Sequence, residues 1–186
     1  MDLKEVDTVL NKFARYIVQS SKDNLTKEKR GDGKLFNSVN YELNQDQFDF
    51  LLSFFMEDYG KFQDQGVKGS NPSLVKNGKQ KAPNSPYSYT TKMPPMKPLM
   101  SWAKSKNIRF RQGKTVNGKW KSTGRYAKGN YITIAFWLQK RIFAQGLKPS
   151  LFFTKPFEVA FQNLPNELMK GFSVDVENKI INAIKK

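Results

Sequence analysis

The feature that most constrains this chain is a stretch of 93 residues, 65–157, which contains 19 Lys and Arg residues and no Asp or Glu. Such a stretch cannot form ion pairs within itself, so its cations face water, an acidic surface or a polyanion. Residues 1–64 hold nine basic and twelve acidic residues, and residues 158–186 hold four of each. Nucleic acid is the obvious polyanion, and a solvated flexible surface is the alternative.

Length and composition exclude several classes of protein. The 186 residues suffice for one domain with a hydrophobic core. The absence of cysteine excludes disulfides, and the absence of histidine removes the commonest general base and metal ligand. The opening MDLKEVD has acids among its apolar positions, so we expect no signal peptide, and the sequence has no apolar run of about 18 residues. We therefore expect no membrane association and a chain that is made in a cytoplasm.

Patterns of known enzymes are also missing from the sequence. It contains no GxxxxGK[ST] phosphate loop, no GxSxG nucleophile elbow and no HExxH zinc motif. Glu57, Asp58 and Asp64 raise the alternative of a metal-dependent nuclease, but oxygen-only metal sites need several converging ligands and nothing else in the sequence supplies them. We expect no enzymatic activity, no metal and no cofactor.

Periodicity predicts the elements near the N-terminus. Spacings of three and four residues predict an amphipathic helix over residues 3–25, with one apolar side made of Leu3, Val6, Leu10, Phe13 and Ile17. In the later part of segment 33–43, the alternation of Val39, Tyr41 and Leu43 with polar residues predicts a half-buried strand. Residues 48–56 predict a second strand after a turn at residues 45–47. The second strand is apolar on both faces, so we expect it inside a sheet. Residues 57–66 predict a short helix.

Residues 66–130 form a basic insertion or arm, rich in Pro, Gly and Lys, within a single domain of residues 1–186. Its prolines exclude long regular elements before Met96. Residues 98–106 predict a short helix with Leu99, Trp102 and Ala103 directed inward. The Asn117–Gly118 turn then predicts a hairpin of residues 108–111 and 119–121.

This hairpin is the best candidate for contact with nucleic acid or an acidic partner. Alternation places Arg109, Arg111, Lys119 and Lys121 on one face and Phe110 and Trp120 on the other, while Trp102 or Tyr126 are candidates to stack on unpaired bases. The candidate contact residues are Lys104, Lys106, Arg109, Arg111, Lys114, Lys119, Lys121, Arg125 and Lys128. In the alternative interpretation Phe110 and Trp120 only anchor the hairpin while its charges are solvated.

The C-terminal third of the sequence predicts helices. The first covers residues 131–145 and is closed by Gly146 and Pro149. Thr154 is the expected N-cap of a helix that runs to residue 164. After Pro165 a last helix carries an apolar stripe, which Gly171 is placed to interrupt; the stripe comprises Leu168, Phe172, Val176, Ile180 and Ile184.

Three segments, taken in order, resemble the tail-completion or neck proteins of tailed bacteriophages. They are GKLFNSV (33–39), DYGKFQDQG (58–66) and KPSLFF (148–153). Together with the long N-terminal helix, the resemblance covers residues 1–66 and 131–164. Two departures are Lys148, where an arginine is common in the family, and the long insertion.

The resemblance implies an α+β subunit with a long N-terminal helix, a small antiparallel sheet and C-terminal helices. It implies a structural virion protein made in the host bacterial cytoplasm, whose homo-oligomeric ring, six-fold or twelve-fold, surrounds the DNA channel at the head-tail junction. The partners would be other copies, a portal or adjacent connector protein, a tail protein and DNA.

Within the segment 147–161 we expect Phe153, Phe157 and Phe161 in the core. The candidate subunit-interface residues are Lys148, Leu151, Phe152 and Lys155. The competing hypothesis for the whole chain is a non-virion, sequence-nonspecific nucleic-acid-binding protein.

Overall fold

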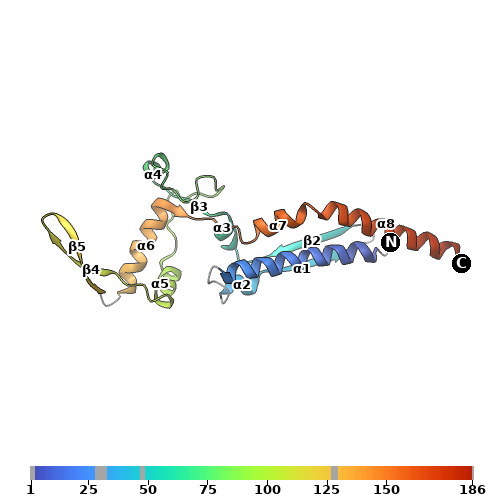
Figure 1. Ribbon diagram of the computed structural model, residues 1–186, viewed down its shortest axis with the longest axis horizontal. Helices are drawn as coiled ribbons and strands as arrows, with labels where there is room; N and C mark the ends of the chain where they lie inside the picture. The colour runs from blue at the N-terminus through green and yellow to red at the C-terminus, as the bar shows by residue number, and fades with distance from the viewer. Residues whose placement is uncertain (1–2, 28–32, 47–48, 127–129, 186) are drawn as a thin grey trace. The chain divides into compact units, whose positions relative to one another are not determined.

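The computed structural model describes residues 3–27, 33–46, 49–126 and 130–185, except for the side chains of Trp120 and Tyr126. Its contacts divide the chain into two compact units. Unit 1 comprises Met1–Gln65 and Ser150–Lys186, and unit 2 comprises Gly66–Pro149. Unit 2 thus continues past residue 130, the end of the predicted insertion, and includes the helix that follows it. The predicted α+β class is confirmed (Figure 1).

Unit 1 is built around one long helix. Its elements are α1 (Lys4–Lys27), α2 (Lys34–Ser38), β1 (Asn40–Gln45), β2 (Phe50–Phe55), α3 (Gly60–Gln65), α7 (Thr154–Phe161) and α8 (Leu164–Ile184). Helix α1 runs along α7 and α8 and contacts β1 (Figure 1). The predicted N-terminal helix is therefore confirmed. The short helix α2 occupies the first part of segment 33–43, ahead of the predicted strand.

Two apolar clusters form the core of unit 1. In the first, the buried residues are Val6, Leu10, Phe13, Ile17 and Leu164, against which one face of the β1–β2 hairpin and Phe157 pack. The rings of Phe13 and Phe157 meet edge to face at 5.8 Å between centroids. The second cluster contains the buried residues Leu25, Leu35, Val39 and Phe152. These two clusters hold the hairpin and α7 against α1.

Strands β1 and β2 form the predicted antiparallel hairpin, with Tyr41 opposite Phe54 and Asn44 opposite Leu51. The prediction that the second strand lies inside a sheet is wrong, because among the described residues β2 pairs with β1 alone. One face of the hairpin packs on helices, and the other face stays uncovered. The turn residue Gln47 and the predicted first strand residue, Phe48, lie outside the described residues.

In unit 1, two buried carboxylates accept hydrogen bonds from the backbone N–H groups at the starts of helices. Asp64 Oδ1 accepts hydrogen bonds from the backbone N–H groups of Phe153 at 2.9 Å and Thr154 at 3.2 Å. Asp175 Oδ2 accepts from the backbone N–H groups of Glu5 at 3.0 Å and Val6 at 3.1 Å. The predicted N-cap, Thr154, is instead the first residue of α7, and its hydroxyl donates to Asp64. A carboxylate from a distant segment therefore replaces the local cap.

Helix α8 is continuous through Gly171, contrary to the predicted interruption. A Cβ at this position would lie 3.3 Å from the backbone carbonyl carbon of Glu5. Glycine therefore permits the close approach of α8 to α1.

Unit 2 contains α4 (Pro72–Lys76), α5 (Met96–Ser105), α6 (Tyr131–Gln145) and two strand pairs. The short strands β3 (Val67–Lys68) and β6 (Gly146–Leu147) pair where the unit begins and ends. Strands β4 (Arg111–Val116) and β5 (Lys119–Tyr126) form the second hairpin. Helices α5 and α6 pack together, and Ala103, Ile134 and Ala135 are buried.

The predicted bounds of α6 and its closure at Gly146, which has φ +85°, are confirmed. The predicted hairpin forms around Asn117–Gly118, but its first strand spans residues 111–116 instead of 108–111. The prediction for Trp102 is wrong, because it is exposed rather than directed inward. Across the described ranges, no helix has both the length and the apolar character that crossing a membrane would require.

Candidate interaction surfaces

The three segments that carry the phage resemblance contact one another through their residues in unit 1. The backbone N–H of Ser150 donates to Gln63 O at 3.1 Å, and the N–H of Leu151 donates to Asp64 O at 2.9 Å. Phe152 packs with Leu35 and Val39. Residues about 30 and 90 positions apart in the sequence therefore form one packed region, the joint, which connects α2, α3 and the start of α7.

Gly60 leaves room for two neighbouring side chains within this joint, which would have to shift for a larger residue. A Cβ on Gly60 would lie 2.7 Å from Met56 Sδ and 2.9 Å from Leu35 Cδ1. Burial raises the pKa of the Tyr59 phenol beside it; the Glu57 carboxylate adds to this rise, and a hydrogen bond with the Leu35 backbone opposes it.

The burial of Phe152 corrects the predicted subunit interface. Its side chain is 1% exposed, and its carbonyl accepts a hydrogen bond from Asn24 Nδ2 at 3.3 Å. Phe152 is therefore a core residue with no surface for a partner. Conversely, Phe161, which was expected in the core, is exposed and stacks on Phe157. Phe153 and Phe157 pack against the core as expected.

The other candidate interface residues lie at the surface. Leu151 is exposed and has φ +54°, while Lys148 and Lys155 are exposed as well. Lys148 belongs to unit 2 and Lys155 to unit 1.

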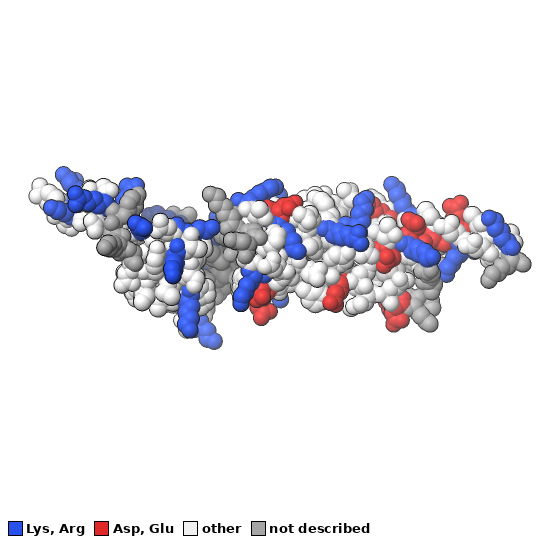
Figure 2. Space-filling view, turned by 90° about the horizontal axis from the view of Figure 1, so that it is seen from below, with Lys and Arg blue, Asp and Glu red and all other residues white. Residues whose placement is uncertain are grey.

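The two units differ sharply in charge. Unit 2, residues 66–149, contains 18 Lys and Arg and no Asp or Glu, whereas the remaining residues contain 14 Lys and Arg and 16 Asp and Glu. Basic side chains without acidic neighbours cover the β4–β5 end in Figure 2, while both signs cover the surface of unit 1. The attraction for anions therefore resides in unit 2.

The β4–β5 hairpin is exposed along its described side chains. Lys114 lies directly opposite Lys121, and Val116 lies opposite Lys119, so these lysines share one face. Like charges directly opposite each other destabilise an antiparallel pair, and an isolated two-stranded hairpin is marginally stable in water. An anion on this face would relieve the repulsion.

The predicted face that joined Arg109 and Arg111 to Lys119 and Lys121 is wrong. Arg109 precedes β4, and its Nε donates to Asn107 Oδ1 at 3.0 Å. Arg111 pairs with Tyr126 beyond an irregularity that interrupts the alternation. Of the other candidates, Lys104 and Lys106 lie at the end of α5, Arg125 lies in β5, and Lys128 is outside the described residues.

Phe110 anchors the segment before β4. Its ring meets Trp137 of α6 edge to face, with 5.8 Å between centroids. This contact attaches the segment to α6, as the anchoring interpretation expects for Phe110, and leaves the role of the hairpin's charges open. The side chains of Trp120 and Tyr126, which were predicted to anchor and to stack, lie outside the described residues.

A second surface of unit 2, which we call the α6 face, consists of Ile132, Phe136, Trp137, Lys140 and Arg141. All five side chains are exposed. Lys140 Nζ lies 4.5 Å from the ring centroid of Phe136, and Arg141 Cζ lies 5.0 Å from that of Trp137. From the sequence, only the buried side of this helix was identified. The signal for the exposed side was a second apolar set, Phe136 and Trp137, which follow Ile132 by four and five residues.

The uncovered side of the β1–β2 hairpin, which we call the hairpin face, combines apolar and acidic groups. Leu51 is 62% exposed and Phe55 47% exposed, and the cross-strand register puts Glu42 on the same face. Residues 35–60 contain five acidic residues and no Lys or Arg. This lack of basic residues could have been found in the sequence, but the charge was counted over residues 1–64, which also contain nine Lys and Arg.

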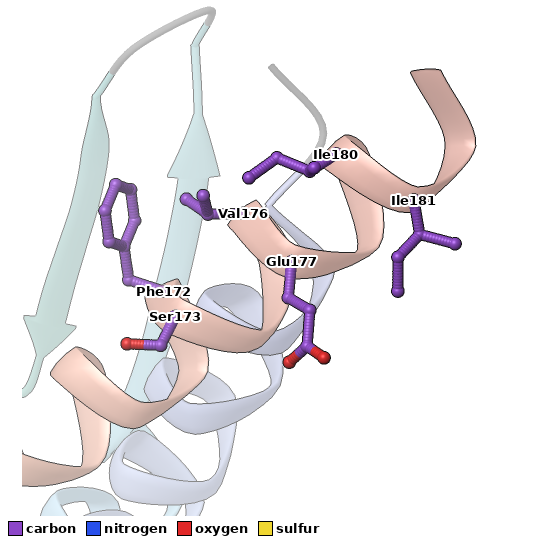
Figure 3. Close-up of a pocket in the computed structure, with 6 residues that line it drawn as sticks. All are labelled: Phe172, Ser173, Val176, Glu177, Ile180 and Ile181. Atoms are coloured by element: carbon purple, nitrogen blue, oxygen red, sulfur yellow. The ribbon is translucent and has the colours of Figure 1, made fainter. Parts of the chain in front are cut away.

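Helix α8 carries the predicted apolar stripe, but much of it is exposed in the single chain. Figure 3 shows a shallow hollow lined by Phe172, Ser173, Val176, Glu177, Ile180 and Ile181. Asp175 marks the point at which α8 meets the start of α1, and every described residue from 177 onward is exposed.

The acids that suggested a nuclease do not gather. Asp64 is buried and occupied as a helix cap, while Glu57 and Asp58 are exposed. Within the described ranges no group of three or more Asp or Glu residues is placed to hold a metal ion. Asp64 instead accepts hydrogen bonds at the start of α7.

Comparisons of this chain with protein-family models, with curated proteins and with solved structures find no match.

Proposed function

We propose that this chain is the subunit of a homo-oligomeric ring at the head-tail junction of a tailed bacteriophage, where it joins portal-side and tail-side proteins around the DNA channel. The observation that carries this proposal is the joint of unit 1. The three segments of the resemblance meet there through Phe152, Asp64 and the backbone of residues 150–151. A resemblance is stronger support for a family when its segments contact one another than when they lie apart on the surface.

Exposed apolar groups support an assembling subunit. The hairpin face and α8 of unit 1, together with the α6 face of unit 2, all present large apolar side chains to water. Contiguous apolar surfaces of this kind are typical of protein–protein contacts. A structural ring also needs no catalytic group.

The net charge sets a condition on assembly. A six-fold ring of a +16 chain would carry about +96, so copies repel one another unless acidic partners, DNA or salt compensate. The copies are therefore expected to associate more readily with added salt, or with a partner protein or DNA.

Electron microscopy of the purified protein and of the phage particle tests this function most directly. We expect rings, and mass spectrometry of purified virions should find the chain at a ring-like copy number. A protein that stays monomeric at high concentration, at every ionic strength and with portal protein present would contradict the ring.

A non-virion nucleic-acid-binding protein is the second candidate, and the lysine face of the β4–β5 hairpin favours it. Contacts of Lys114, Lys119 and Lys121 with phosphates would give binding that weakens steeply with salt and is independent of sequence. A ring subunit would share this property, so salt dependence does not separate the two. Absence of the chain from purified virions would favour the second candidate.

A further inference from the structure

We infer that the hairpin face of one copy binds the α6 face of the next copy. This inference rests on the proposed ring and names the contact that would build it. The hairpin face belongs to unit 1 and the α6 face to unit 2. Because the two surfaces differ, the contact is heterologous, and repeating it produces a closed ring or an open filament.

The two surfaces match in apolar character. Leu51 and Phe55 lie on the same face of β2, with Ser53 between them on that face, and are 62% and 47% exposed. On α6, Ile132 and Phe136 lie one turn apart and are 61% and 46% exposed. Each surface thus presents a pair of large apolar side chains whose burial would favour association.

The two surfaces are opposite in charge. The segment around the hairpin, residues 35–60, carries five acidic residues and no basic one, whereas unit 2 carries no acidic residue. Glu42 lies beside the apolar pair of the hairpin, and Lys140 and Arg141 lie beside the apolar pair of α6. Contact between two α6 faces would instead bring two strongly positive units together.

Cation–π contacts favour a protein as the occupant of the α6 face over nucleic acid. Stacking on bases requires open ring faces. Lys140 already covers a face of Phe136, and Arg141 covers a face of Trp137. Carboxylates can still pair with the outer sides of these cations. An acidic surface with exposed aliphatic and aromatic groups therefore fits better, and the second copy supplies one.

Two variants that block one surface each provide the main test. Leu51→Lys places a cation on the hairpin face, and the double variant Ile132→Glu with Phe136→Glu places carboxylates on the α6 face. All three side chains are exposed, so the fold should be retained. Light scattering and sedimentation should find rings for the original chain and monomers for each variant. We expect the dimer dissociation constant to rise about a hundredfold.

Mixing the two variants distinguishes head-to-tail contact from other arrangements. Each variant keeps the surface that the other lacks, so the mixture should form one-to-one dimers and nothing larger. Matched controls are Met169→Lys in unit 1 and Val75→Glu in unit 2, both at exposed apolar positions. These controls should assemble like the original chain.

Engineered cysteines add a positional test, because the chain has no cysteine of its own. Ser53→Cys lies on the hairpin face, and Thr133→Cys lies beside the α6 face. Oxidation of an equimolar mixture of the two variants should give a disulfide-linked heterodimer in more than the twofold excess over either homodimer that random pairing produces. A random one-to-two-to-one distribution of the three products, or less heterodimer than that, would overturn the inference.

Failure of this inference is distinguishable from failure of the proposed function. Rings that survive both surface variants, or that are lost in Ile180→Lys instead, overturn the contact proposed here and leave the ring in place. An original chain that never associates also overturns the contact. Absence of the chain from virions overturns the proposed function, even if copies associate through these surfaces.

Discussion

At the scale of single residues, two buried carboxylates connect distant parts of unit 1. Asp64 and Asp175 are 4% and 5% exposed, and each accepts backbone N–H groups at the start of a helix. Such acceptors satisfy donors that would otherwise have no partner, and they lie at the positive end of the helix dipole. Asp64, one of the three acids that raised the nuclease alternative, therefore has a structural use as a helix cap.

Replacing Asp64 by Ala should destabilise unit 1 by about 2 kcal/mol, because α7 loses its cap and its N–H groups stay buried. Asp64→Asn should cost less, since an amide oxygen can still accept one of the bonds. Urea unfolding followed by circular dichroism measures both. An unchanged midpoint for Asp64→Ala would contradict the capping role.

Replacing Phe152 by Lys should prevent folding of unit 1 rather than impair assembly alone. The side chain fills the second core cluster, where even truncation to Ala is expected to cost about 3–5 kcal/mol. Leu151→Lys is the matched control, because the side chain of Leu151, next to Phe152 in the sequence, is exposed. A folded Phe152→Lys monomer that fails to assemble would restore Phe152 to the subunit interface.

At the scale of elements, periodicity predicted what local sequence determines. The bounds of α6 follow from its apolar spacing, from Asn130 as N-cap and from Gly146 at its end. The cap of α7 was predicted wrongly, because its acceptor is 90 residues away in the chain. The prediction that β2 lies inside a sheet was also wrong. A strand with apolar residues on both faces has the same sequence pattern whether its second face is covered by its own chain, by a partner or by neither.

Gly171→Leu should destabilise unit 1, although leucine has the higher helix propensity. The side chain would meet the backbone of Glu5 and Val6 and push α8 away from α1. A lower melting temperature by circular dichroism measures this effect. Met169→Leu in the same helix is the control, because that position is exposed. Equal stability of both variants would show that the helices can separate without cost.

Lys114→Glu should order the β4–β5 hairpin in the free chain and weaken its binding to polyanions. The new carboxylate lies opposite Lys121, so repulsion becomes attraction worth about 0.2–1 kcal/mol. Slower amide exchange over residues 111–126 measures the first effect, and a smaller salt dependence of DNA binding measures the second. Lys76→Glu on α4 controls for net charge. Identical behaviour of the two variants would contradict a specific lysine face.

At the scale of the whole molecule, the sequence charge indicated that two parts of the chain differ, but it did not give the boundary between them correctly. The stretch without carboxylates marked unit 2 in the sequence, but Pro and Gly content placed its end at residue 130, before α6. The regular register around the Asn117–Gly118 turn gathers Lys114, Lys119 and Lys121 on one face, whereas the irregularity between Arg111 and Gly113 lies beyond it and was not visible in the sequence. The α6 and hairpin faces became visible only when burial was known.

Unit 1 should fold without unit 2. The residues that flank the second unit lie close together, because the N–H of Ser150 donates to Gln63 O and the N–H of Leu151 donates to Asp64 O. Both core clusters and both carboxylate caps belong to unit 1. Joining residue 65 to residue 150 through a short glycine linker should therefore preserve a cooperative, helical fold.

The same shortened chain separates the roles of the two units. It has lost the 18 basic residues of unit 2, so it should not bind DNA at salt concentrations at which the full chain binds. It keeps the hairpin face but lacks the α6 face, so it should join a full-length copy as a chain terminator and reduce ring size in mixtures. Circular dichroism checks the fold, and sedimentation of mixtures checks termination. A shortened chain that forms rings by itself would assign assembly to unit 1 alone.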